Sequence, residues 1–283
     1  MITDAKGMTA QLTDWISKQE TRDDTLAVQP ARFMQATLDQ APSLRAGDAL
    51  PPLWHWLYFL DAKPLSELGR DAHPKKGGFL PPVPLPRRMW AGGRLQFHAP
   101  LVLGEAAQKT STIKSVVEKS GKSGPLCFVT VEHLIHQHGA LALREEHDIV
   151  YRSDPDADAP QPAPPPAPAS PEFSRIVQPS EVMLFRYSAL TFNGHRIHYD
   201  VDYARSVEGY DGLVFHGPLT ATLLAALAEA QSGQTLTSFA FTARAPLAGM
   251  TPFELQGRGA DDDMSLWAKR ADGACAMEAV AGF

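Results

Sequence analysis

The spacing of apolar residues changes several times along the chain, and each spacing predicts a different element. In the N-terminal region apolar residues recur every three or four positions, which is the period of an amphipathic helix. We therefore expect helices at Thr9–Lys18, where Thr9 can cap the first turn, and at Pro30–Leu38, which presents Phe33, Met34 and Leu38. The charged segment Glu20–Asp24 is expected to connect them.

The segment Asp48–Leu60 contains four aromatic side chains within six residues of each other, Trp54, Trp56, Tyr58 and Phe59. Large aromatic side chains are more often buried than exposed. We therefore expect a core helix or strand lying under a sheet. An exposed aromatic binding platform is the less favoured alternative.

Beyond Gly93 the pattern changes to that of strands, with β-branched or alternating apolar residues between glycine and proline turns. The expected strands are 94–99, Ala107–Val117, Gly124–His136 and Ala140–Tyr151. The spacing of His133, His136 and His138 within this region does not direct three ligands to one point on a strand, so a solvated hairpin end is favoured over a zinc site. We predict no metal.

The Pro/Ala-rich segment Asp154–Pro171 marks the clearest boundary, because such a sequence forms an extended linker rather than a sheet strand. We expect an N-terminal unit at 1–153 and a C-terminal unit at 172–283, packed side by side with their sheets joined. In the second unit the pattern predicts a strand, a helix whose buried side is rich in leucine, and four further strands. These elements are expected at Val182–Phe192, Pro218–Ala230, Leu236–Ala245, Pro252–Gly257, Ser265–Lys269 and Ala274–Val280.

Composition narrows the class of protein. A chain of 283 residues that is 44% hydrophobic and 20% charged is globular. The net charge of −6 argues against a nucleic-acid partner. Two cysteines, Cys127 and Cys275, cannot form a disulfide framework. Neither a signal peptide nor an apolar segment long enough to span a bilayer is recognised, so we expect a cytoplasmic protein without a membrane partner.

The residues best suited to chemistry gather in one stretch that ends in Asn193, His195, Arg196, His198 and Asp200. A second element, with His216 and Gly217 at the expected start of a helix, follows shortly afterwards. Imidazoles, an amide and free N–H groups at a helix start are the parts that move protons next to a carbonyl group.

The two elements together resemble the hydratase-2 (MaoC-like) branch of the hotdog-fold acyl-thioester hydratases and dehydratases. That family's motif reads aromatic-x-x-Ser/Thr-Gly-Asp-x-Asn-Pro-aliphatic-His. Ile197 and His198 match its end, but its aspartate becomes Asn193, its asparagine becomes His195 and its proline becomes Arg196. The later glycine, histidine, glycine and leucine are present as Gly212, His216, Gly217 and Leu219.

The variant motif and the segment Gly77–Arg94 resemble the branch that contains mitochondrial-type hydroxyacyl-thioester dehydratases and mesaconyl-C4-CoA or itaconyl-CoA hydratases. The resemblance extends from about Trp15 to the C-terminus. It implies an α+β fold, a tandem (double) hotdog in which each half is a long helix wrapped by an antiparallel sheet. It also implies a homodimer or higher homo-oligomer that acts on acyl-CoA without a further cofactor.

The resemblance also implies how the work is divided. His198 would transfer the proton and Asn193 would orient water or the thioester, since an amide does not titrate. The N–H of Gly217 would bind the thioester carbonyl, and His216 would line the same pocket. His195 and Arg196 would bind a substrate carboxylate, or else pair with surface acids. Whether Asp200 replaces the missing carboxylate is left open.

The loop Asp71–Arg88 is rich in proline and glycine and carries Lys75, Lys76, Arg87 and Arg88. It is either a solvated connection or a lid, followed by Trp90, that binds the nucleotide end of coenzyme A. The resemblance implies that a branched C5-dicarboxylic enoyl-CoA, itaconyl-CoA or mesaconyl-C4-CoA, is hydrated to citramalyl-CoA. The alternatives are a 3-hydroxyacyl-thioester dehydratase of fatty-acid synthesis and an inactive acyl-CoA-binding protein.

Overall fold

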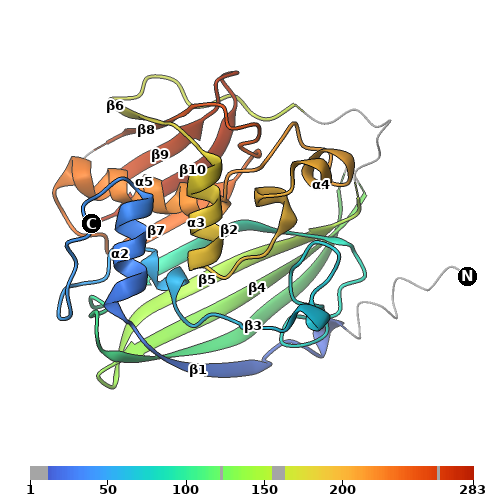
Figure 1. Ribbon diagram of the computed structural model, residues 1–283, viewed down its shortest axis with the longest axis horizontal. Coiled ribbons are helices and arrows are strands. Elements are labelled where there is room, and N and C mark those ends of the chain that lie inside the picture. The colour runs from blue at the N-terminus through green and yellow to red at the C-terminus, as the bar shows by residue number, and fades with distance from the viewer. Residues whose placement is uncertain (1–11, 122–123, 155–162, 260–261) are drawn as a thin grey trace, which may run out of the picture.

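The protein forms one antiparallel sheet of ten strands, in the order β1-β3-β4-β5-β2-β7-β10-β9-β8-β6 (Figure 1). The computed structural model describes residues 12–121, 124–154, 163–259 and 262–283. The strands are β1 Gln19–Thr25, β2 Arg87–Phe97, β3 Ala106–Gly121, β4 Gly124–Gln137, β5 Ala140–Arg152, β6 Phe173–Val177, β7 Ser238–Ala243, β8 Phe253–Arg258, β9 Asp263–Lys269 and β10 Cys275–Gly282. The α-helices are α2 Val28–Thr37, α3 Glu181–Leu190, α4 Val201–Ser206 and α5 Gly217–Ser232, with 3₁₀ turns η1 Trp54–Leu57, η2 Leu65–Glu67 and η3 Arg196–His198.

The sheet consists of two five-stranded halves with the same internal order. Counted from its outer edge, each half has its first, third, fourth, fifth and second strand in chain order. The two halves meet where β2 pairs antiparallel with β7, Leu95 lying opposite Phe239. The expected joining of the two sheets is therefore present. The boundaries at residues 153 and 172 stay predictions, because residues 155–162 of the linker lie outside the described residues.

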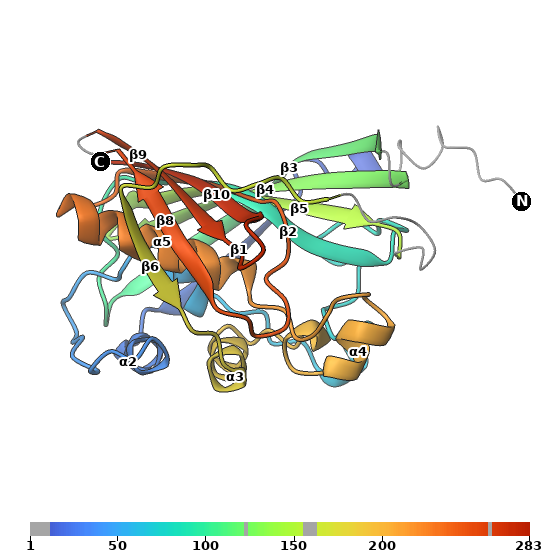
Figure 2. The same ribbon diagram turned by 90° about the horizontal axis from the view of Figure 1, so that it is seen from above.

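The helices all lie on one face of the sheet (Figure 2). The long helix α5 packs on the C-terminal half with Leu219 and Leu224 fully buried. Proline in its first turn and Gly233 at its C-terminal cap, with φ of 69°, set its two ends. The helix expected at Pro218–Ala230 is confirmed, and so are the four strands expected after it.

The N-terminal half contains no helix like α5 among its described residues. Within Asp48–Leu60 only the 3₁₀ turn η1 forms, because Leu53 and Phe59 take positive φ values of 69° and 56° and interrupt the chain on either side. The aromatic side chains are nevertheless mostly core, with Trp54, Tyr58 and Phe59 at most 5% exposed. The core interpretation is therefore confirmed, whereas the wrapped helix expected there is absent.

Several local predictions are wrong. Val182–Phe192 is the helix α3 rather than a strand, because Ser180 caps it by accepting a hydrogen bond from the Met183 N–H. Glu20–Asp24 is part of β1, an edge strand paired with β3. Strand β6 was not expected. Phe33 is 53% exposed, although α2 forms as predicted.

Of the helix expected at Thr9–Lys18, only Leu12 and Thr13 are helical among the described residues, and the chain then turns at Ser17. Both cysteines are free and buried.

Candidate active site

The turn after α3 places Asn193 at the centre of the site. The helix ends at Leu190, and the Asn193 N–H then donates back to the Ser188 carbonyl (2.8 Å). Phe192, at the position where the family motif has glycine, adopts a left-handed φ of 49°. The Asn193 side-chain oxygen accepts a hydrogen bond from the His195 N–H (3.0 Å). Its side-chain nitrogen donates to no described residue and is available to a ligand.

His198 is held as a neutral imidazole with one free nitrogen. Its Nδ1 lies 2.7 Å from the Val214 carbonyl oxygen, which can only accept, so Nδ1 carries the hydrogen. The Nε2 atom is then left with a lone pair. Burial lowers the pKa of His198 to about 4, so the ring is uncharged at neutral pH. A neutral imidazole with a free Nε2 is a general base.

His216 supports His198 rather than lining the cavity. The two rings are stacked with centroids 3.6 Å apart, and His216 is fully buried. Its Nε2 atom makes a 2.9 Å hydrogen bond with the Ser188 hydroxyl, which ties the His216 loop to α3. His216 therefore fixes the plane of the His198 ring.

His195 extends this group of imidazoles toward the N-terminal half. Its ring centroid lies 5.6 Å from that of His198 and 4.2 Å from that of His73, whose Nδ1 is 2.9 Å from an Asp71 carboxylate oxygen. Ligand atoms of Asp71, His73 and His195 lie within 4.8 Å of one another, a spacing that a metal ion could use. The hydrogen bond between Asp71 and His73 already explains why two of these three side chains lie close together. We therefore propose no metal site here.

A cavity of about 350 Å³, which we call the His198 cavity, collects most of the expected residues. Asn193, His195, His198 and Gly217 line it, together with Trp90 from the N-terminal half. Gly217 is the first residue of α5, where an N–H group has no partner within the helix. The positive end of the helix dipole lies at the same place.

Two further cavities are lined mainly by the N-terminal half, and Trp90 lines all three. The loop cavity, about 400 Å³, is lined by His73–Lys75 and Arg88. The Glu145 cavity, about 280 Å³, extends to Asn193. Lys109, His133 and His147 line both of these N-terminal cavities.

Glu145 is the most buried acid of this region and its oxygens are both occupied. One accepts from the Trp56 indole (3.0 Å) and the other lies 2.9 Å from His55 Nε2. Burial alone would raise the pKa of Glu145, but the hydrogen bond from His55 and the nearby imidazoles outweigh it and hold that pKa well below its usual range. Sequence reasoning missed this cluster. Alternation along β4 could have indicated that His133 faces inward, where its Nδ1 is 2.8 Å from the Ser111 hydroxyl.

Arg196 and Asp200 are not brought to the cavity. Arg196 pairs with Asp200 (2.7 Å) and lies over the Tyr203 ring. The Asp200 carboxylate also caps α4 by accepting from the Tyr203 N–H (3.0 Å). Neither residue lines a described cavity, so we leave both out of the proposed site.

The Arg87 side chain is buried in an ion pair rather than exposed on the loop. Its Nε lies 2.5 Å from a Glu208 carboxylate oxygen, both side chains are 5% exposed, and its Nη2 donates to the Tyr210 hydroxyl (2.9 Å). This buried pair joins β2 to the segment after α4. It is therefore not available to bind a nucleotide.

We expect Arg87→Met to destabilise the protein by about 3 kcal/mol, because it leaves the Glu208 charge buried without its partner. The double variant Arg87→Met/Glu208→Leu should recover part of the loss, since no uncompensated charge remains. Urea denaturation midpoints measure both changes. Equal stability of the single variant and the wild type would contradict this account.

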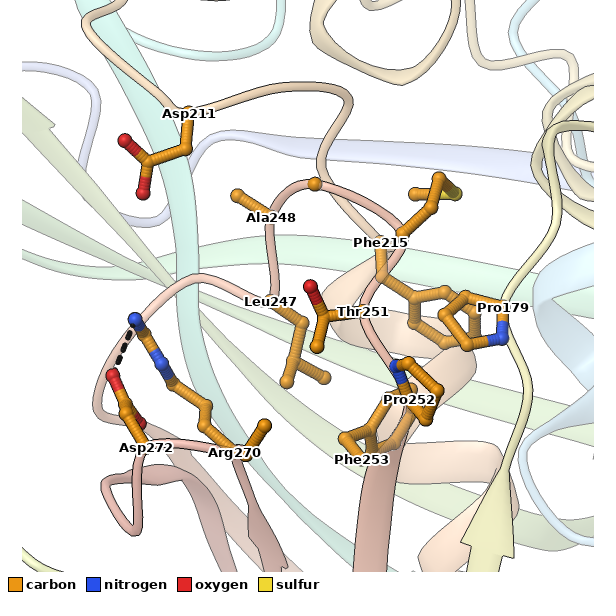
Figure 3. Close-up of a pocket in the computed structure, with 13 residues that line it drawn as sticks. Pro179, Asp211, Phe215, Leu247, Ala248, Thr251, Pro252, Phe253, Arg270 and Asp272 are labelled. Atoms are coloured by element: carbon orange, nitrogen blue, oxygen red, sulfur yellow. Dashed lines mark hydrogen bonds and ion pairs between the residues drawn. The ribbon is translucent and has the colours of Figure 1, made fainter.

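The depression drawn in Figure 3 is a different feature, about 390 Å³ in volume, on the C-terminal half. Its floor is apolar, with Phe215 and Phe253, and its Arg270 pairs with Asp272 (2.8 Å). It has no imidazole in its lining and is separated from the His198 cavity by Phe215 and Leu247, which border both. We do not place the reaction there.

None of the described helices is long and apolar enough to cross a membrane.

The chain is similar to known proteins over most of its length. The hydroxyacyl-thioester dehydratase type 2 family matches residues 53–249. The chain is 47% identical over 267 residues to a mesaconyl-C(4)-CoA hydratase of Chloroflexus aurantiacus, covering 94% of this chain and 95% of that one. A MaoC-like dehydratase structure from Phytophthora capsici aligns over 97% of this chain and 98% of that one, with a TM-score of 0.72 and 11% identity.

A structure of a conserved Mycobacterium tuberculosis protein described as a double hotdog aligns over 96% of this chain and 98% of that one, with a TM-score of 0.56 and 15% identity. The expected tandem hotdog fold is thereby confirmed. The chain belongs to the hydroxyacyl-thioester dehydratase type 2 family.

Proposed function

We propose that this protein is a hydro-lyase that adds water to an α,β-unsaturated acyl-CoA. The observation that carries the proposal is the neutral His198, whose free Nε2 lies in one cavity with Asn193 and the first residue of α5. The similarity to a mesaconyl-C(4)-CoA hydratase supports a branched C5-dicarboxylic substrate, mesaconyl-C4-CoA. Addition of water to the α,β double bond of this substrate gives citramalyl-CoA.

In the proposed reaction His198 Nε2 removes a proton from a water molecule that Asn193 orients. The water oxygen bonds to the β-carbon, and the electrons of the double bond move onto the thioester oxygen. The N–H of Gly217 and the dipole of α5 stabilise this enolate. The enolate then takes the proton back from His198 at its α-carbon, which leaves the imidazole neutral for the next turnover.

Three titratable side chains in the lining of the N-terminal cavities favour a short acyl group over the long chains of fatty-acid synthesis. A long alkyl chain leaving the His198 cavity past Trp90 would meet Lys109, His133 and His147. Covering these groups with hydrocarbon removes their water and gives no hydrogen bond in return. A dehydratase acting on long 3-hydroxyacyl thioesters is therefore the weaker alternative.

A steady-state absorbance assay tests the proposal through loss of the enoyl-thioester band. Mesaconyl-C4-CoA is expected to be hydrated faster than crotonyl-CoA or a long-chain enoyl-CoA. Binding of all three without turnover would instead favour the inactive acyl-CoA-binding alternative. We expect activity to survive treatment with a chelator, since the proposed steps use no cofactor besides the coenzyme A thioester. A homodimer or higher oligomer in the cytoplasm completes the proposal, and sedimentation measures the oligomeric state.

The pKa of His198 predicts how the rate depends on pH. Since the base is already deprotonated well above pH 4, kcat/KM should stay constant from pH 6 to pH 8. If the base were an ordinary imidazole with a pKa of 6.5, kcat/KM would fall clearly as the pH decreased from 8 to 6. Initial rates in buffers of matched ionic strength measure the difference. A half-maximal rate near pH 6.5 would show that the essential base is not a buried His198.

A further inference from the structure

Strand β2 carries three arginines, and two of them have acidic partners. Arg87 pairs with Glu208, and Arg94 pairs with both Glu146 and Asp148. Arg88, which is half-buried, interacts with the neutral Tyr151 hydroxyl but makes no ion pair with any acid in the described part of the chain. A partly buried guanidinium without a counter-charge is costly for a folded protein. Such a group is expected where an anionic ligand completes the pairing.

Arg88 lies at the junction of the His198 cavity and the loop cavity and lines both. Burial is the main cause of the low pKa values of His73, His195 and His147, and the charge of Arg88 lowers all three further. The guanidinium therefore lies within electrostatic reach of His195, the neighbour of His198. Lys109 lines only the two N-terminal cavities and is placed farther along the path.

Two anions of an acyl-CoA could meet this arginine. The phosphates of the nucleotide are separated from the thioester by the whole pantetheine arm, so they lie far from a thioester bound beside His198. A free carboxylate on the acyl group is different. In mesaconyl-C4-CoA it is attached to the carbon that accepts water, and it must lie in the same cavity as His198.

We propose that Arg88 binds the free carboxylate of the acyl group and selects dicarboxylic enoyl-CoA substrates. This inference rests on the proposed hydratase function, and it replaces the expectation that Arg88 binds the nucleotide. A planar guanidinium matches a carboxylate through two parallel N–H···O bonds, which would also fix the orientation of the reacting carbon.

The test compares mesaconyl-C4-CoA with crotonyl-CoA, which lacks the carboxylate. Arg88→Met should lower kcat/KM for mesaconyl-C4-CoA by about 10- to 100-fold, the usual range for a lost charge-assisted hydrogen bond. The rate with crotonyl-CoA should change by less than about threefold. Arg88→Lys should retain an intermediate preference, because it keeps the charge without the two-point geometry. Arg94→Met is the matched control, since it removes an exposed and already paired arginine from the same strand.

Several outcomes would overturn the inference. Equal losses of kcat/KM with both substrates would show that Arg88 does not recognise the free carboxylate. Unchanged thermal melting of the variant would then exclude a purely structural role. A loss confined to CoA esters and absent from pantetheine esters would identify the nucleotide as the ligand. If the wild type hydrates no enoyl-CoA, the proposed function fails. Calorimetric binding of citramalyl-CoA and 3-hydroxybutyryl-CoA then tests separately whether Arg88 binds a free carboxylate. A tenfold preference for citramalyl-CoA that Arg88→Met abolishes supports it, and equal binding rejects it.

Discussion

Replacing His198 by alanine is expected to lower kcat by about two to four decades, the usual contribution of a general acid or base. The reason is that Nε2 of this ring has a free lone pair on a neutral imidazole and that His198 lines the same cavity as the first residue of α5. KM should change much less, because the imidazole is proposed to act on water rather than to hold the coenzyme. Rapid-quench measurement of the chemical step separates the two quantities.

The effect of His198→Ala on activity should be compared with the effects of two Asn193 variants. Asn193→Ala should cost less, about 1–3 kcal/mol of transition-state stabilisation, because one positioning hydrogen bond is lost and no proton carrier is removed. Asn193→Asp restores the carboxylate of the family motif. We expect it to keep or raise activity and to add an acidic limb to the pH profile, since a second titrating group enters the cavity.

A His198→Ala variant with near-normal turnover would contradict the proposed mechanism at its centre. His195 would then be the next candidate, because its ring is 5.6 Å from that of His198 and lines the same cavity. Asp200 would not, because Arg196 and the start of α4 already occupy its carboxylate. His216→Asn is a useful companion variant. It removes the stacked ring and should lower kcat without abolishing it, since His216 only positions the base.

The sequence predicted those parts of the molecule whose structure is fixed locally. Helix α5 has proline at its start, glycine at its end and a continuous apolar surface, so its bounds could be predicted within a few residues. Helix α3 could not be separated from a strand by its apolar content alone. The capping hydroxyl of Ser180 and the burial of Leu184 and Tyr187, three positions apart, are what distinguish it.

The site was harder to predict where it depends on contacts between distant segments. Arg87 and Arg88 are neighbours in sequence, but alternation along β2 sends one into an ion pair with Glu208 and the other to the cavity junction. Likewise His73 approaches His195 only because the loop before β2 folds against the C-terminal half. Spacing along one strand carries no information about such partners.

The protein is expected to lose its fold steeply on acidification. Burial lowers the pKa of His198 and His147 to about 4 and that of His133 to about 3. In the unfolded chain each imidazole has a pKa near 6.5. Below that pH the unfolded state therefore binds more protons than the folded state. Stability is complete above pH 6.5 and falls as the pH decreases toward the folded values. At pH 5 each imidazole favours unfolding by about 2 kcal/mol. Three such groups approach the total stability of a typical domain, about 5–15 kcal/mol.

Urea denaturation at pH 7.5, 6.0 and 5.0 measures this loss of stability. The variant His133→Gln shows how much of the loss comes from one buried imidazole. His133→Gln removes one of the three imidazoles, so its free energy of unfolding should fall between pH 7.5 and pH 5.0 by about 2 kcal/mol less than that of the wild type. Loss of the contact with Ser111 lowers its stability at every pH, and the slope therefore carries the information rather than the absolute value. His138→Gln is the matched control, because His138 is exposed at the tip of the same hairpin and should leave the slope unchanged. Identical slopes for all three proteins would mean that His133 is not held neutral by burial. Acid sensitivity would then have to come from the carboxylates, with Glu145 and its hydrogen bond from His55 as the first to examine.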